Sequence, residues 1–188
     1  MSSLALRGHE FYVKVGDDTA ALERLRAVVG ADCSVVRGPG SAYCVVLWAD
    51  ETFDPPEQLL ATLSRDLSTE VIWLAWQKQV DAFAFQRWVG GNVVRRLAYG
   101  IMEKERTWEL VEGTSEPWEV EAFFSSKRLE RELQVRTLFP GNDDVTEQEL
   151  RRVWAKRLLV VDREHPRLVA IDAAWAVARH FRLPGWSA

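Results

Sequence analysis

The order of hydrophobic patterns along residues 1–76 constrains the fold of this chain more than any other feature. Short aromatic and β-branched runs, which are typical of strands, alternate with segments in which leucine and valine recur at helical spacing. In chain order, these strand and helix patterns cover 9–15, 22–29, 33–37, 42–48, 55–67 and 69–76. The resulting order of strand, helix, strand, strand, helix, strand predicts the ferredoxin-like β-α-β-β-α-β arrangement of an α+β protein.

Local signals mark the ends of these elements. A polar residue among 17–19 can cap the first helix, and Gly30 is a typical C-terminal stop. Asp54 and the two prolines that follow it predict the start of the second helix. The Gly-Pro-Gly sequence at 38–40 predicts a short hairpin turn between the second and third strands.

Strand patterns continue beyond the fourth strand and extend the predicted sheet by antiparallel hairpins to about seven strands. Segments 80–88 and 93–99 read as two strands joined by the Gly-Gly-Asn turn at 90–92, and 107–111 predicts one more. Residues 71–76 are apolar at both parities, which indicates that both faces of the sheet are covered. We therefore expect the C-terminal helices to pack on the sheet.

The part of the chain after Gly113 is predicted to be mainly helical. Residues 118–124 fit either a helix or a strand, and both alternatives remain open at this stage. Thr146 and Glu149 have the spacing of a capping box, and Pro166 is expected to open the last helix. We interpret 1–188 as a single domain, with 1–113 as the sheet-and-helix core and 114–188 as its mainly helical part.

Composition places the chain among ordinary globular proteins. Its 188 residues are 47% hydrophobic and carry a formal net charge of −4. No apolar run approaches the roughly 18 residues of a membrane span, and the first residues lack the pattern of a secretory signal. Cys33 and Cys44 are too few for a disulfide framework. We therefore expect a cytoplasmic protein that does not bind membranes.

The sequence carries no recognisable catalytic or metal-binding motif. His9, His165 and His180 have no second metal-type ligand at helical spacing, so no catalytic residue, metal or cofactor is predicted. Nucleic-acid binding is also not expected, because the chain is acidic and the strand at 42–48 contains no basic residue.

The most distinctive segment is acidic and contains two Trp-Glu pairs. Between 103 and 121, seven glutamates stand against Lys104 and Arg106. Two indoles beside carboxylates could hold a cation on a partner, or a sugar. The predicted partner-binding residues are Glu105, Arg106, Trp108, Glu109, Glu112, Glu116, Trp118 and Glu119. The competing interpretation is structural, because the basic segment 151–188 could neutralise these acids within the fold.

Four charged residues of the predicted hairpin strands raise a second question. They are Asp81, Arg87, Arg95 and Arg96. In a regular hairpin, Arg95 and Asp81 could pair across strands, as a buried structural pair or as an exposed seat for an anion.

A resemblance to other proteins rests on two segments, Glu105-Arg106-Thr107-Trp108-Glu109 and Glu116-Pro117-Trp118-Glu119. The stretch from 81 to 100 and the closing Leu183-Pro184-Gly185-Trp186 add to it. They resemble uncharacterised bacterial proteins with an E-R-T-W-E…E-P-W-E signature. This resemblance implies no known activity and no functional residues.

These observations predict a non-enzymatic protein-binding module, or an assembly or adaptor component such as an immunity protein. Its expected partner is another protein with a basic surface, or a second copy of the chain. The alternative is a small-ligand-binding regulatory domain. A third possibility is a hydrolase that uses carboxylates of 103–119 as acid and base.

Overall fold

The computed structural model describes residues 7–30, 33–47, 55–100, 106–138 and 145–186. The strands are β1 (Arg7–Lys14), β2 (Ser34–Arg37), β3 (Tyr43–Leu47), β4 (Glu70–Gln77), β5 (Ala82–Val89), β6 (Asn92–Tyr99) and β7 (Trp108–Gly113). The helices are α1 (Thr19–Val29), α2 (Glu57–Asp66), α3 (Pro117–Phe123), α4 (Ser126–Leu138), α5 (Glu147–Lys156) and α6 (Ala170–Phe181).

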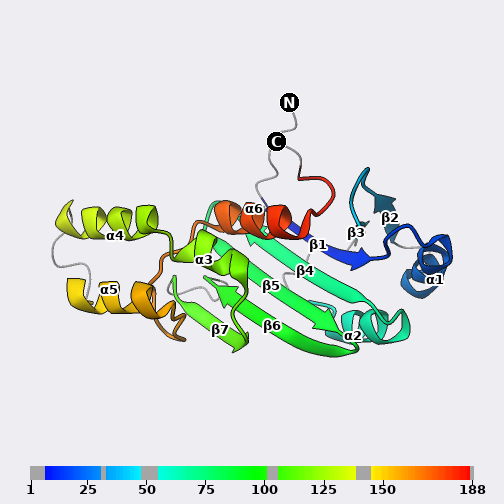
Figure 1. Ribbon diagram of the computed structural model, residues 1–188, viewed down its shortest axis with the longest axis horizontal. Helices are drawn as coiled ribbons and strands as arrows, with labels where there is room; N and C mark the ends of the chain where they lie inside the picture. The colour runs from blue at the N-terminus through cyan, green and yellow to red at the C-terminus, as the bar shows by residue number, and fades with distance from the viewer. Residues whose placement is uncertain (1–6, 31–32, 48–54, 101–105, 139–144, 187–188) are drawn as a thin grey trace.

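One antiparallel sheet of seven strands forms the centre of the molecule, as the sequence predicts (Figure 1). Its strand order is β2-β3-β1-β4-β5-β6-β7. Strand β1 therefore lies inside the sheet, between β3 and β4. From β4 onward, successive hairpins extend the sheet to its edge at β7.

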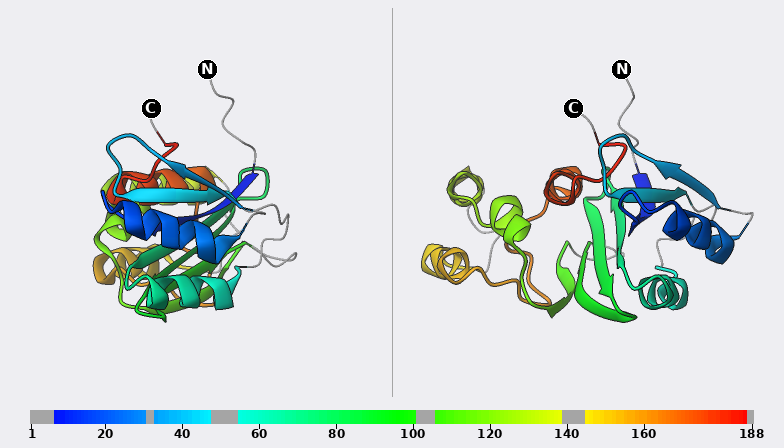
Figure 2. Two further views of the ribbon diagram at one scale, coloured as in Figure 1. Left: turned by 90° about the vertical axis from the view of Figure 1, so that its right-hand side faces the viewer. Right: turned by 45° about the vertical axis from the view of Figure 1, so that its right-hand side comes forward.

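Both faces of the sheet are covered, and Figure 2 shows helices on either side of it. On one face, Phe11, Val13 and Trp73 pack in a cluster with apolar residues of α1 and α2. On the other face, Tyr12 and Phe85 pack in a cluster with residues of α3 and α6. This alternation follows from the period of two along each strand, which sends neighbouring side chains to opposite faces. The predicted packing of C-terminal helices on the sheet is confirmed.

Helix boundaries agree with several of the predicted signals and correct others. The Asp18 carboxylate caps α1 by accepting hydrogen bonds from two backbone N–H groups, and Thr146 and Glu149 form the predicted capping box of α5. The last helix, α6, begins at Ala170 instead of Pro166. Asp54, the expected cap of α2, lies outside the described residues.

The segment between β7 and α5 contains two helices. The ambiguous residues 118–124 form α3, where Glu116 and Glu119 make a second capping box. The next helix, α4, has no counterpart among the predicted elements. Glu132 is its only residue classed as buried, since α4 stands with α5 beside the sheet and not on it (Figures 1 and 2).

Candidate functional site

The two tryptophans of the predicted partner-binding segment lie in the core. Trp108 is 0% exposed and Trp118 is 2% exposed. The Trp108 Nε1–H donates to the Pro166 carbonyl at 3.1 Å, and the Trp118 Nε1–H donates to the Glu116 carboxylate at 2.9 Å. Both rings also contact Phe123 edge-on. The expectation of exposed indole plates is therefore wrong, because these rings fill the space between the sheet and α3.

The two buried acids of this segment are held by arginines of the sheet. Arg95 on β6 binds Glu119 through two hydrogen bonds of 2.8 and 2.6 Å, and Arg87 on β5 binds Glu116 at 2.6 Å. The structural interpretation predicted internal pairing with the basic segment 151–188. Glu121 does lie 3.4 Å from Arg179 of that segment, but Glu116 and Glu119 pair with arginines that precede the acidic segment. The predicted pair of Arg95 with Asp81 is also absent, because the register pairs Arg95 with Arg87 and places Asp81 beyond the opposite end, where Phe83 pairs with Tyr99.

The other predicted residues of the segment lie in different environments. Glu112 is exposed and lies 3.5 Å from Arg96. Glu109 is partly buried on β7, and Glu105 lies outside the described residues. Arg106 has a side chain that is 58% exposed and lies 3.2 Å from Asp81. The eight residues therefore do not form one surface.

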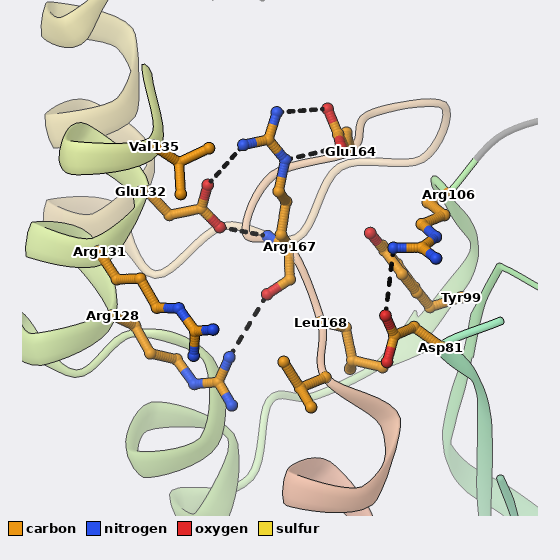
Figure 3. A pocket seen from close by; sticks show the side chains of 11 residues that line it. Asp81, Tyr99, Arg106, Arg128, Arg131, Glu132, Val135, Glu164, Arg167 and Leu168 are labelled. Atoms are coloured by element: carbon orange, nitrogen blue, oxygen red, sulfur yellow. Dashed lines mark hydrogen bonds and ion pairs between the residues drawn. The ribbon is translucent and has the colours of Figure 1, made fainter. Parts of the chain in front are cut away.

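Arg106 instead belongs to a cleft between the sheet and the helix α4 (Figure 3). The cleft has a volume of about 310 Å³. One wall is α4, the second is the segment 164–169 that leads into α6, and the third is formed by residues at the ends of β5 and β6. Its lining residues are Asp81, Tyr99, Arg106, Arg128, Arg131, Glu132, Val135, Glu164, Arg167, Leu168 and Val169.

Helical spacing explains why α4 presents several of its side chains to the cleft. Counted from Arg128, the other three lining residues lie at i+3 (Arg131), i+4 (Glu132) and i+7 (Val135). The four side chains therefore share one face of the helix. The helix is anchored at its start, where the Trp154 Nε1–H of α5 donates to the carbonyl of residue 125 at 3.2 Å. This stripe was the sequence signal that could have located the cleft.

Each carboxylate that lines the cleft already has a partner. Arg167 binds Glu164 through hydrogen bonds of 2.6 and 3.0 Å. The Arg167 backbone N–H donates to Glu132 at 2.9 Å, and the buried His165 lies 3.3 Å from the same carboxylate. Asp81 faces Arg106 and accepts a 3.4 Å hydrogen bond from the Ala170 N–H. These contacts tie α4 to the segment 164–169 and compensate the negative charges of the cleft.

The two arginines of α4 that line the cleft, Arg128 and Arg131, are much less well compensated. The Arg128 guanidinium makes two long contacts, to the Arg167 carbonyl at 3.5 Å and to Asp172 at 3.3 Å. Burial lowers the pKa of Arg128, and the neighbouring positive charge of Arg131 acts in the same direction. Asp172 opposes this shift. Arg131 itself forms no ion pair with any residue that the structure describes, and Figure 3 shows both side chains extending from α4 on the same side of the cleft.

A tyrosine hydroxyl completes the polar lining. Tyr99 is buried, and its pKa is raised because burial disfavours the phenolate. The neighbouring Leu168 backbone lowers this pKa, against the larger effect of burial. Chemically, the cleft offers guanidinium and hydroxyl donors with no uncompensated carboxylate, which is the environment that suits an anion.

Comparisons with protein-family models, curated protein sequences and solved structures give no match for this chain. Within the described ranges, no group of three or more histidine, cysteine, aspartate or glutamate side chains could hold a metal ion. No helix among the described residues has the length and apolar character needed to cross a membrane.

Proposed function

We propose that this protein is a non-enzymatic binding protein that holds a small anionic ligand in the cleft between α4 and the sheet. The observation that carries the proposal is the pair of guanidinium groups of Arg128 and Arg131 on one wall. A carboxylate or phosphate between them would receive charge-assisted hydrogen bonds and relieve the repulsion of the two cations. Planar guanidinium groups match the two oxygens of a carboxylate better than an ammonium does.

The size of the cleft supports a small ligand. Its volume of about 310 Å³ lies at the lower end of the roughly 300–1,000 Å³ range of small-molecule sites. The engaged state of Glu132, Glu164 and Asp81 supports binding over acid–base catalysis, because each carboxylate is held by an arginine or a backbone N–H. The proposal thus favours the ligand-binding alternative of the sequence analysis over the carboxylate-dependent hydrolase.

An adaptor or immunity-type role with a basic protein partner takes second place. That role relied on Trp108 and Trp118 as contact residues, and their burial gives it no surface in this segment. We keep self-association of the chain as a further proposal. We also propose a cytoplasmic location and no binding to nucleic acid, and composition and net charge support these two.

We also propose that β1 to β4 with α1 and α2 form a ferredoxin-like core. The support is the order β2-β3-β1-β4 of these strands, the antiparallel pairing of neighbours, and the packing of α1 and α2 against a single face. The hairpins from β5 onward would then be the addition that brings Tyr99 and Asp81 to the cleft.

Isothermal titration calorimetry with inorganic phosphate and with acetate tests the proposed function at constant ionic strength. The wild-type protein should bind at least one of these anions with saturation. Arg131→Gln should weaken that binding at least tenfold, which corresponds to about 1.4 kcal/mol. The matched control is Arg24→Gln, which removes an exposed arginine of α1 on the other face of the sheet. Equal binding by Arg131→Gln and wild type, or no saturation, would overturn the proposal.

A further inference from the structure

We infer that the cleft is built for a small dicarboxylate, with one carboxylate at each end of the ligand. This inference rests on the proposed function and adds a binding group for the second end of the ligand. It comes from the hydrogen-bond capacity that remains at the wall opposite Arg128 and Arg131. Figure 3 shows Arg106, Tyr99 and Asp81 on that opposite side, apart from the two arginines of α4.

Arg106 has donor capacity to spare. A guanidinium carries five N–H donors, and the contact with Asp81 at 3.2 Å uses one of its nitrogens. The side chain is 58% exposed, so it can turn toward a ligand at low cost. The positive charge of Arg106 also acts on Tyr99, whose pKa it lowers against the larger effect of burial. Figure 3 shows the Arg106 and Tyr99 side chains next to each other, so one acceptor group of a ligand could meet both.

Tyr99 supplies the second donor at this wall. Tyr99 lines the cleft, and Figure 3 shows its side chain beside Arg106. A tyrosine hydroxyl can donate one hydrogen bond, and a ligand carboxylate at this wall would accept it.

The two walls together require acceptors at both ends of the ligand. The carboxylates between the two walls, Glu132 and Glu164, are both paired with Arg167. A cationic group on the ligand would therefore find no unpaired carboxylate to bind there. A single small anion would satisfy one wall only. A dicarboxylate satisfies both, and its chain would lie against the apolar side chains of Val135, Leu168 and Val169.

A length series of dicarboxylates tests this inference against matched monocarboxylates. Malonate, succinate, glutarate and adipate are titrated calorimetrically into the wild-type protein, with butyrate and acetate as single-ended controls. Because a short ligand cannot reach both walls and a long one must fold to fit between them, affinity should pass through a maximum at an intermediate length. The best dicarboxylate should bind at least tenfold more tightly than butyrate.

Two variants locate the second end. Arg106→Gln should reduce the preference for the best dicarboxylate over butyrate to less than threefold, because it weakens dicarboxylate binding more than butyrate binding. Tyr99→Phe should reduce the preference in the same direction, and circular dichroism checks that it folds. Arg106 is exposed, so its variant keeps the test valid if Tyr99→Phe does not fold.

The outcomes separate this inference from the proposed function. Equal affinity for butyrate and every dicarboxylate would overturn the two-ended ligand and leave the anion site standing. An unchanged preference in Arg106→Gln would also overturn it. Absence of binding for all of these anions, phosphate included, would overturn both.

Discussion

Arg95 on β6 and Glu119 on α3 form an ion pair that is buried from solvent on both sides, with side chains 3% and 0% exposed. Arg95 also donates to the carbonyls of Glu112 and Gly113, and Glu119 also accepts from the Ser115 hydroxyl and the Glu116 N–H. Arg95 therefore makes four hydrogen bonds, and both carboxylate oxygens of Glu119 accept from it. This pair fixes α3 on the sheet and sets the direction in which the chain continues into α4.

Removing one member of this pair should destabilise the protein strongly. Glu119→Ala leaves an uncompensated buried guanidinium, and we expect the free energy of unfolding to fall by about 3–5 kcal/mol. The double variant Arg95→Met/Glu119→Leu removes both charges and should lose much less. Urea unfolding followed by circular dichroism measures both values. A double variant that is less stable than Glu119→Ala would contradict this account.

Trp118 should behave as a core residue. Trp118→Ala removes a large buried side chain, so we expect a loss of about 3–5 kcal/mol in unfolding free energy. The control is Glu112→Ala in the same predicted segment, which should change stability by no more than about 0.5 kcal/mol because Glu112 is exposed. The same urea experiment applies, and two equal effects would show that burial does not govern this segment.

Gly113 ends β7 in a conformation that no other residue fits well. Its φ is +81°, and a Cβ atom would lie 2.1 Å from the Val94 carbonyl oxygen. Gly185 has a similar φ of +85° but open space around it. Both Gly→Ala variants should lose about 1–2 kcal/mol from the left-handed conformation, and Gly113→Ala should lose more because of the clash. Thermal unfolding of the two variants gives the difference, and equal losses would argue against crowding at Gly113.

The capping box of α5 predicts a pH dependence. Hydrogen bonds from the Thr146 backbone and hydroxyl lower the pKa of the Glu149 carboxyl. A lowered pKa in the folded state means that the ionised form adds stability above the unfolded pKa of about 4.3. This contribution is lost as the pH falls through the folded pKa. Stability of wild type and Glu149→Gln should therefore converge on acidification below pH 4, and NMR titration of the Glu149 side chain should show the lowered pKa. Curves of stability against pH that stay parallel for the two proteins would contradict the predicted contribution of Glu149.

Strands and most helices of this protein could be predicted because their signals are local. Period-two alternation, turn glycines and the capping residues Asp18 and Thr146 act within a few positions of the chain. The start of α6 was misplaced because Pro166 lies in the extended segment that forms a wall of the cleft. The helix α4 escaped prediction because only one of its residues is buried, so its apolar pattern is weak.

Partners in the site could not be predicted, because they depend on contacts between distant parts of the chain. Seven glutamates near two tryptophans look the same whether they face solvent or the arginines of β5 and β6. The basic C-terminal segment was the expected neutralising partner and supplies Arg179 to Glu121, whereas Arg87 and Arg95 neutralise the buried Glu116 and Glu119. Arg106 of the described partner-binding residues and Asp81 of the charged hairpin residues line the cleft, and their role depends on α4, which lies across the cleft from them.

The most direct measurement of the central claim is an NMR titration that observes the arginine side-chain Nε–Hε signals while succinate is added. The account predicts that the signals of Arg128, Arg131 and Arg106 shift together along one saturable curve, and that those of Arg24 and Arg152 stay in place. Shifts spread evenly over exposed arginines, or none at Arg128 and Arg131, would contradict an anion site in this cleft.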